Sequence, residues 1–221
     1  MIVLIGTEKG GTGKSTIATN LAALRAQDGV EVLLVDADKQ MTSSFWAAKR
    51  NDDESRSRVV CVQKRGKAIH RDIQDLARRY EDIIIDAGGQ DSHELRSAMV
   101  VADRLYLPLQ PAQADIWTLE TMEDLVAQAQ ALNDHLEVSV VINRGPTHPR
   151  VPEIAEAIVC LQEFPSLPFS GVVLHERRAF RKAMTLGLSV AELEPPDPKA
   201  VAEIRSLYNT IYYAETESHT Q

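Results

Sequence analysis

The sequence has few cysteines, no long apolar run and no excess of positive charge. Its only cysteines, Cys61 and Cys160, lie far apart, with no C-x-x-C pair and no histidine at metal-ligand spacing. This excludes a disulfide scaffold, a zinc module and most iron–sulfur sites, and it fits a reducing cytoplasm. The N-terminus is apolar for only five residues, and no other run approaches membrane length, so neither a signal peptide nor a membrane span is predicted.

Acidic residues outnumber basic ones by 32 to 24, which gives a net charge of −8. A protein coated in basic charge for nucleic acid is therefore excluded, and any anionic partner must meet a local patch. Hydrophobic residues at 44% and charged residues at 25% are ordinary for a globular chain and argue against disorder. The length of 221 residues predicts a single domain over 1–221.

Short apolar segments alternate with helical patterns along the whole chain. Segments rich in β-branched residues predict strands at 2–5, 32–35, 59–62, 83–85, 104–107, 138–142 and 172–174. The alternation predicts an α/β fold, a mostly parallel twisted sheet of about seven strands with helices on both faces.

Two of the expected helices have clear apolar faces. The first carries Ile17, Leu21 and Leu24 at helical spacing and ends near residues 28–29. The last is an amphipathic helix predicted over residues 197–214, directly after a proline-rich break, and we expect it to pack on the domain. Residues 215–221 then form a polar tail.

A glycine-rich loop directly follows the first predicted strand, and it reads Lys9-Gly10-Gly11-Thr12-Gly13-Lys14-Ser15-Thr16. Glycines let successive backbone amides approach an anion, and the helix that follows adds its partial positive charge. The loop predicts a polyphosphate site in which Lys14 neutralises the β and γ phosphates and Ser15 supplies an oxygen ligand to Mg²⁺. The alternative, a capped glycine turn without a ligand, does not account for the strand–loop–helix context.

The loop departs from the strict G-x-x-x-x-G-K-S pattern, because Glu8 replaces the first glycine and a lysine follows it. In this form it resembles the deviant Walker A motif of the ParA/MinD group of ATPases, and most of all the short ParA-type partition ATPases. The resemblance implies ATP and Mg²⁺ as cofactors and a nucleotide sandwich homodimer, in which Lys9 reaches the nucleotide of the other subunit. Lys9 would then stabilise transition-state charge as an arginine finger does. Without its glycine context, it would be interpreted as an exposed loop lysine.

Aspartates end two predicted strands, at the sheet edge where ligands of parallel sheets gather. Each alone could be a turn or capping residue, but beside a phosphate loop a functional role is favoured. Asp86 is interpreted as the Walker B carboxylate that holds magnesium, and Gly88-Gly89 as a loop that senses the γ phosphate. The run Asp36-Ala37-Asp38-Lys39-Gln40 is similar to the family's Asp-x-Asp-Pro-Gln switch. This similarity implies that Asp38 orients the attacking water and that Asp36 belongs to the outer magnesium shell.

The chain also differs from the family in both switch segments. Lys39 stands where proline is usual, and Ala87-Gly88-Gly89-Gln90 stands in place of a Thr-Pro-Pro type of run. Further resemblances lie at residues 108–111 with Asp115, and at Asn143, which would face the adenine base. An asparagine after a strand is, on its own, more often a turn residue.

Four cations, Arg177, Arg178, Arg181 and Lys182, fall within six residues of this acidic chain. Together with the run 187–192 they resemble the C-terminal segment of partition ATPases. If a dimer doubled this patch, it would bind the phosphate backbone of DNA without reading bases, and ATP would switch DNA binding on by switching the dimer on. The alternative is a solvated helix face paired with Glu176 and Glu192.

These features predict a ParA-type ATPase, cytoplasmic and nucleoid-associated, that positions a plasmid or similar cargo. We expect slow ATP hydrolysis, stimulated by a ParB-type or analogous adaptor protein. Because the chain starts at the first strand, we expect no N-terminal helix-turn-helix domain, and the acidic C-terminal tail disfavours membrane docking.

Two alternatives remain open. One is a dethiobiotin-synthetase-like ligase of the same fold, for which residues 5–7 are mildly suggestive, although Lys9 and the Asp-x-Asp-x-Gln run count against it. The other is a dimeric interaction module that nucleotide holds together with little hydrolysis. The cysteine count excludes an iron-protein reductase or cluster carrier.

Overall fold

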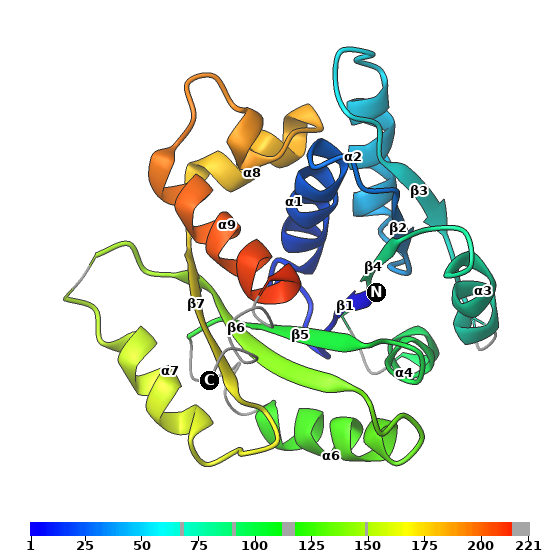
Figure 1. The fold of residues 1–221 in the computed structure, drawn as a ribbon. Coiled ribbons are helices and arrows are strands. Elements are labelled where there is room, and N and C mark those ends of the chain that lie inside the picture. The colour runs from blue at the N-terminus through cyan, green and yellow to red at the C-terminus, as the bar shows by residue number, and fades with distance from the viewer. Residues whose placement is uncertain (67–68, 90–91, 112–117, 149, 214–221) are drawn as a thin grey trace, which may run out of the picture.

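The fold is built on one parallel β-sheet, described here in a computed structural model that covers residues 1–66, 69–89, 92–111, 118–148 and 150–213 (Figure 1). The seven strands lie in the order β3-β2-β4-β1-β5-β6-β7, and every neighbouring pair is parallel. They are β1 (Ile2–Ile5), β2 (Val32–Asp36), β3 (Val60–Gln63), β4 (Asp82–Asp86), β5 (Arg104–Leu109), β6 (Glu137–Gly145) and β7 (Phe169–His175). The predicted fold class is confirmed, and each strand lies where the sequence predicts it, with ends that differ by at most three residues.

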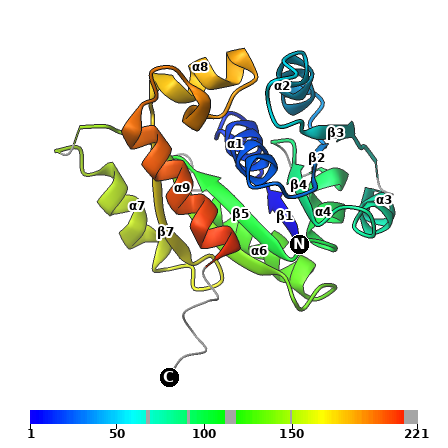
Figure 2. The ribbon, with the colours of Figure 1, turned by 45° about the horizontal axis from the view of Figure 1, so that its top comes forward.

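Helices connect the strands and cover both faces of the sheet (Figures 1 and 2). They are α1 (Lys14–Gln27), α2 (Thr42–Asn51), α3 (Ile69–Leu76), α4 (His93–Met99), α6 (Leu119–Gln130), α7 (Glu153–Leu161), α8 (Arg178–Leu186) and α9 (Pro198–Tyr212), with a 3-10 turn η1 (Val190–Glu192). Among the described residues, no helix is both long enough and apolar enough to cross a membrane.

Two hydrophobic cores lie on opposite faces of the sheet. One packs α1, α2, α8 and α9 against the strands, and it includes the predicted face of α1, Ile17, Leu21 and Leu24, all buried. The other packs α3, α4, α6 and α7 against the opposite face, with Met122 and Val126 of α6 buried in it. Strands β1, β2 and β4 contribute to both cores because successive side chains of a strand point to opposite faces.

The C-terminal helix α9 begins as the sequence predicts. The Asp197 carboxylate accepts hydrogen bonds from the backbone amides of Lys199 and Ala200, and Pro198 occupies the first turn. Ile204, Tyr208 and Ile211 form its buried side. The helix predicted over 197–214 is therefore found over 198–212, and the predicted tail, 215–221, lies outside the described residues.

The segment after α8 joins that helix to α1 and α2. Trp46 Nε1 donates to the Leu188 carbonyl at 3.1 Å, and the Val190 amide donates to Asn20 Oδ1 at 2.8 Å. The buried Arg50 guanidinium makes two bonds to Glu192, at 2.7 and 2.8 Å. The run 187–192 that resembled partition ATPases thus has a packing role, and Glu192 pairs with α2 instead of with the predicted basic patch.

The strand order brings the predicted site segments to one edge of the sheet. Because all strands are parallel, their carboxyl ends lie together, and β1 sits between β4 and β5. In the ladder Ile5 pairs with Asp86, and Asp86 pairs with Asp36. The loops that follow β1, β2 and β4 therefore start side by side at the position where parallel α/β sheets bind ligands.

Candidate nucleotide-binding site

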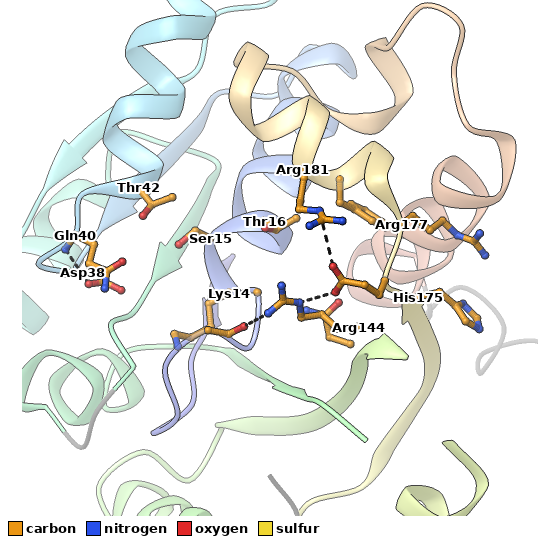
Figure 3. A pocket seen from close by; sticks show the side chains of 15 residues that line it. Lys14, Ser15, Thr16, Asp38, Gln40, Thr42, Arg144, His175, Arg177 and Arg181 are labelled. Atoms are coloured by element: carbon orange, nitrogen blue, oxygen red, sulfur yellow. Dashed lines mark hydrogen bonds and ion pairs between the residues drawn. The ribbon is translucent and has the colours of Figure 1, made fainter. Parts of the chain in front are cut away.

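A pocket of about 310 Å³ opens at this carboxyl edge (Figure 3). Its described lining comes from the loop after β1, the loop after β2, the end of β6, and the segment from β7 into α8. The lining residues are Gly11, Gly13, Lys14, Ser15, Thr16, Asp38, Gln40, Thr42, Asn143, Arg144, His175, Glu176, Arg177, Phe180 and Arg181. The pocket thus brings together the predicted phosphate loop, Asp38, Asn143 and two of the four predicted DNA-binding cations.

The loop between β1 and α1 has a backbone that glycine favours. Gly11 has φ 78° and Gly13 has φ 93°, both in the left-handed region. Gly13 caps the start of α1 without any side-chain hydrogen bond to the first amides, which have no partners within the helix. The positive end of α1 and its first amides are therefore available to an anionic ligand.

Lys14 is the buried cation of the loop, with 5% of its surface exposed. Its Nζ donates to the Lys9 carbonyl at 2.8 Å, which folds the side chain back over the loop. Burial lowers the pKa of Lys14, and the carboxylates of Asp86 and Asp38 raise it. A polyphosphate bound here would meet an ammonium group that is already positioned.

Asp86 ends β4 and is fully buried. Its Oδ2 accepts from Ser43 Oγ at 2.6 Å, while its Oδ1 has no hydrogen-bond partner among the described residues. Burial raises the pKa of Asp86 to about 7, against the lowering effect of the Ser43 and Ser15 hydroxyls, and the charge of Asp36 raises it further whereas that of Lys14 lowers it. An unsatisfied buried carboxylate oxygen beside a serine hydroxyl fits a hard cation.

The described residues contain no group of three His, Cys, Asp or Glu side chains that could hold a metal ion. A magnesium ion at Ser15 and Asp86 would therefore take most of its ligands from water and from a bound phosphate, as Mg²⁺ commonly does. The residues present fit that arrangement.

The two aspartates after β2 have different surroundings. Asp36 is fully buried, and its oxygens accept from the amide of Asp38 at 3.1 Å and from the amide and hydroxyl of Ser44 at 2.8 and 2.7 Å. Asp38 lines the pocket, and its Oδ1 accepts from the Gln40 amide at 2.9 Å. Asp36 therefore fixes the loop that presents Asp38, and its place in the outer magnesium shell stays a prediction.

The glycines after Asp86 serve a close backbone contact. A Cβ added to Gly89 would lie 2.5 Å from Gly10 Cα and 2.7 Å from the Lys9 carbonyl oxygen. The same addition at Gly88 would meet Asp38 only at an ordinary 3.6 Å. The loop after β4 thus rests directly on the phosphate loop, whereas Gln90 and Asp115, also named by the resemblance, lie outside the described residues.

The end of β6 holds the phosphate loop from the other side. Asn143 Nδ2 donates to the Thr12 carbonyl, so the predicted base-facing amide also fastens the loop. The next residue, Arg144, has φ 56° and donates from Nη1 to the Gly11 carbonyl at 2.7 Å. Gln110 Nε2 donates to the same carbonyl at 3.0 Å.

The four cations of the predicted basic patch differ in their surroundings. Arg178, Arg181 and Lys182 are exposed on α8. The Arg177 guanidinium makes three hydrogen bonds to Glu203 of α9, at 2.5 to 3.1 Å, and only 15% of its side chain is exposed. Three of the four predicted cations are therefore exposed on the surface, although Arg181 lies 3.9 Å from Glu176, and Glu203 neutralises the fourth.

The family description "CobQ/CobB/MinD/ParA nucleotide binding domain" matches residues 3–190. The chain belongs to this family. It is similar to "Maintenance of carboxysome distribution protein A" of Halothiobacillus neapolitanus, with 26% identity over 204 residues that cover 92% of each chain.

Solved structures show the same fold. An ATP complex of a Cyanothece McdA variant matches with a TM-score of 0.80 at 17% identity, over 95% of both chains. The septum site-determining protein MinD of Pyrococcus horikoshii, complexed with Mg-ADP, matches with a TM-score of 0.75 at 19% identity, over 96% of both chains. Both proteins have this ParA/MinD-type fold, and both structures contain a nucleotide.

Lys9, the residue that distinguishes the ParA/MinD type of loop, is partly buried and is not among the residues that line the pocket of its own chain. What the pocket uses is its backbone, since the Lys9 carbonyl accepts the bond from Lys14. The role of its side chain in a second subunit stays a prediction.

Arg144 and Glu176 line the pocket, but the sequence did not predict either of them at the nucleotide site. Glu176 was considered only as a possible partner of the basic patch. Arg144 follows Asn143 at the end of a predicted strand, so its position at the site edge could have been noticed. Its left-handed backbone and its bond to Gly11 have no sequence signal, because they depend on how β6 meets the phosphate loop.

Gly89→Ala is expected to weaken ATP binding by at least about fivefold, because a Cβ there displaces Gly10 and the phosphate loop, and overpacking of this kind costs about 1–3 kcal/mol. Titration with a fluorescent ATP analogue measures the change. Gly88→Ala is the matched control and should bind nearly as the native chain does. Equal affinity of Gly89→Ala and the native chain would contradict the proposed contact.

Proposed function

We propose that this chain is a ParA-type positioning ATPase. It binds Mg-ATP, forms a nucleotide sandwich homodimer, binds DNA without sequence specificity, and hydrolyses ATP slowly until an adaptor protein on its cargo stimulates it. The observation that carries the proposal is the glycine loop in which Lys14 lies buried close to Asp86 and Asp38 while Lys9 stays outside the pocket of its own chain. Similarity to a carboxysome distribution protein over nearly the whole chain supports a positioning role.

Each pocket residue has a distinct task in this proposal. The first amides of α1 and the Lys14 ammonium bind and orient the phosphates, and Ser15 and Asp86 hold the metal. The bound Mg-ATP supplies the electrophilic phosphorus and part of the charge neutralisation. Asp38, which the Gln40 amide anchors, accepts a hydrogen bond from the attacking water and orients it. Lys9 of the partner subunit completes the charge stabilisation.

The location of the exposed cations supports DNA binding controlled by nucleotide. Arg181 lines the rim of the pocket, and Arg178 and Lys182 belong to the same helix, α8. A dimer would present two copies of this set, which suits contacts to phosphates that do not depend on base sequence. The proposed location of the protein on the nucleoid, in the cytoplasm, follows from such binding.

ATP turnover with and without non-specific DNA tests the proposal, and the native chain is expected to hydrolyse ATP faster with DNA. Replacing Arg178, Arg181 and Lys182 by alanine should weaken DNA binding by at least about tenfold at moderate salt and reduce its salt dependence, since each lost phosphate contact lowers the slope of log K against log salt by about 0.9. Affinity for ATP should change far less than affinity for DNA, because Lys14 and the phosphate loop are retained, although Arg181 also lines the pocket.

A matched control removes three exposed arginines in and after α3, Arg71, Arg78 and Arg79. An equal loss of DNA binding in this control would contradict the assignment to α8, because net charge alone would then explain the effect. An ATP hydrolysis rate that is the same with and without DNA would favour a ligase of the same fold. ATP binding without any hydrolysis would favour a dimeric interaction module.

A further inference from the structure

Three charged side chains connect the phosphate loop to the exposed cations of α8. Arg144 donates from Nη1 to the Gly11 carbonyl at 2.7 Å and from Nε to Glu176 at 2.6 Å. The other oxygen of Glu176 lies 3.9 Å from Arg181 Nε. Figure 3 labels Arg144 and Arg181 and marks these contacts with dashed lines. Arg144, Glu176 and Arg181 are called the relay below.

The backbone at the end of β6 is held in a strained form that places Arg144 in the relay. A φ of 56° at a residue with a long side chain costs about 1–2 kcal/mol and persists only where the surroundings impose it. Here the Glu176 amide donates to the Gly145 carbonyl at 2.8 Å, which joins the residue after Arg144 to the start of the segment that carries Glu176. The two partners of the ion pair are therefore fixed by the same contact.

The Arg144 side chain controls the orientation of one loop peptide. Gly11 has φ 78°, and its carbonyl accepts from both Arg144 and Gln110. Because the peptide unit is planar, fixing this carbonyl also fixes the direction of the Thr12 amide on its opposite side. A bound phosphate that keeps the loop in this form would in turn keep Arg144 in its place.

Glu176 is shared unequally by two cations that compete for it. Its bond to Arg144 is short, whereas its contact with Arg181 is long, and the side chain of Arg181 is 69% exposed. The two cations face different oxygens of Glu176, but the carboxylate has a single negative charge and cannot neutralise two guanidinium groups. When Glu176 binds Arg144 more strongly, it therefore binds Arg181 less strongly. Conversely, when Arg181 binds another anion, Glu176 binds Arg144 more strongly.

We propose that Glu176 couples the nucleotide pocket to the DNA-binding face through this competition. Bound nucleotide stabilises the hydrogen bond between Arg144 and the Gly11 carbonyl, and it thereby strengthens the ion pair between Arg144 and Glu176. Arg181 is then free to bind a DNA phosphate. By thermodynamic reciprocity, DNA that binds Arg181 tightens the pocket on nucleotide. Arg144 and Glu176 act as positioning residues, and the inference rests on the proposed function for its DNA end.

The test compares the DNA affinity of the native chain with that of Glu176→Gln, with and without the non-hydrolysable analogue AMPPNP and Mg²⁺. Without nucleotide, Glu176→Gln is expected to bind a random-sequence duplex about two- to fivefold more tightly, the value of an exposed ion pair, with a salt slope steeper by about 0.9 per chain. DNA should also tighten AMPPNP binding less in this variant. Thermal unfolding checks that the fold is retained.

Two controls make the result specific. Glu156→Gln removes the same charge from an exposed position on α7, outside the pocket lining. In an Arg181→Gln background, Glu176→Gln should bring no gain in DNA affinity, because its effect acts through Arg181. If Glu176→Gln and Glu156→Gln change nucleotide-free DNA binding equally, the coupling role of Glu176 is overturned. If the native chain binds DNA no better with AMPPNP than without it, the proposed control of DNA binding by nucleotide is wrong. That outcome differs from equal effects of Glu176→Gln and Glu156→Gln, which overturn only the coupling role of Glu176.

Discussion

Lys14→Met is expected to lower affinity for ATP by at least about 100-fold, because charge-assisted hydrogen bonds to phosphate contribute about 1.5–3 kcal/mol each and this ammonium would reach two phosphates. The side chain is buried, with its Nζ directed by the Lys9 carbonyl, so no other described cation occupies this place in the loop. Methionine has a similar length and fills the same space. Calorimetric titration with ATP and Mg²⁺ measures the loss.

The matched control for this substitution is Lys182→Met, which removes the same charge from the exposed surface of α8. Its affinity for ATP should equal that of the native chain. ATP binding by Lys14→Met within threefold of native, with the fold intact, would mean that the glycine loop does not hold the phosphates.

Lys9→Ala is expected to leave ATP binding nearly unchanged and to lower DNA-stimulated turnover by about 10³-fold or more, the size of the effect of an arginine finger supplied in trans. Binding should survive because the loop uses the Lys9 carbonyl, which alanine retains, and because the Lys9 side chain does not line its own pocket. Single-turnover hydrolysis at saturating ATP separates the chemical step from binding.

Mixing two inactive variants distinguishes a trans role of Lys9 from a cis role. Asp38→Asn retains Lys9 but should fail to orient water, whereas Lys9→Ala retains Asp38. In a mixed dimer, the pocket of the Lys9→Ala subunit keeps Asp38 and receives Lys9 of the partner subunit, so the mixture should regain a measurable part of native turnover. A mixture as inactive as its components would place the action of Lys9 within its own subunit.

The fold could be predicted because buried parallel strands have a strong sequence signal. Strands covered on both faces consist of near-continuous apolar residues, as in β2 and β4, and their positions follow directly. The ends of β6 and β7 were predicted least well. Their pairing contains register shifts between residues 140 and 145, and such irregularity depends on the neighbouring strand and not on local sequence.

The site was predictable where function lies in one contiguous segment, as in the phosphate loop from Lys9 to Thr16. It was not predictable where a role depends on a partner distant in sequence. Arg177 is charged and lies among other cations, yet Glu203 of α9, 26 residues later, neutralises it. Glu192 was a partner of the same cations only in the alternative interpretation, and it binds Arg50, 142 residues earlier. These pairs form only in the folded chain, where Glu203 of α9 meets Arg177 and Glu192 of η1 meets Arg50 of α2.

The mass of the particle in solution, measured by light scattering with Mg-AMPPNP and with Mg-ADP, shows whether triphosphate drives self-association. We expect twice the 24.5 kDa of one chain with the triphosphate analogue and the mass of a single chain with ADP. A single-chain mass in both states, at nucleotide concentrations that saturate the pocket, would contradict it.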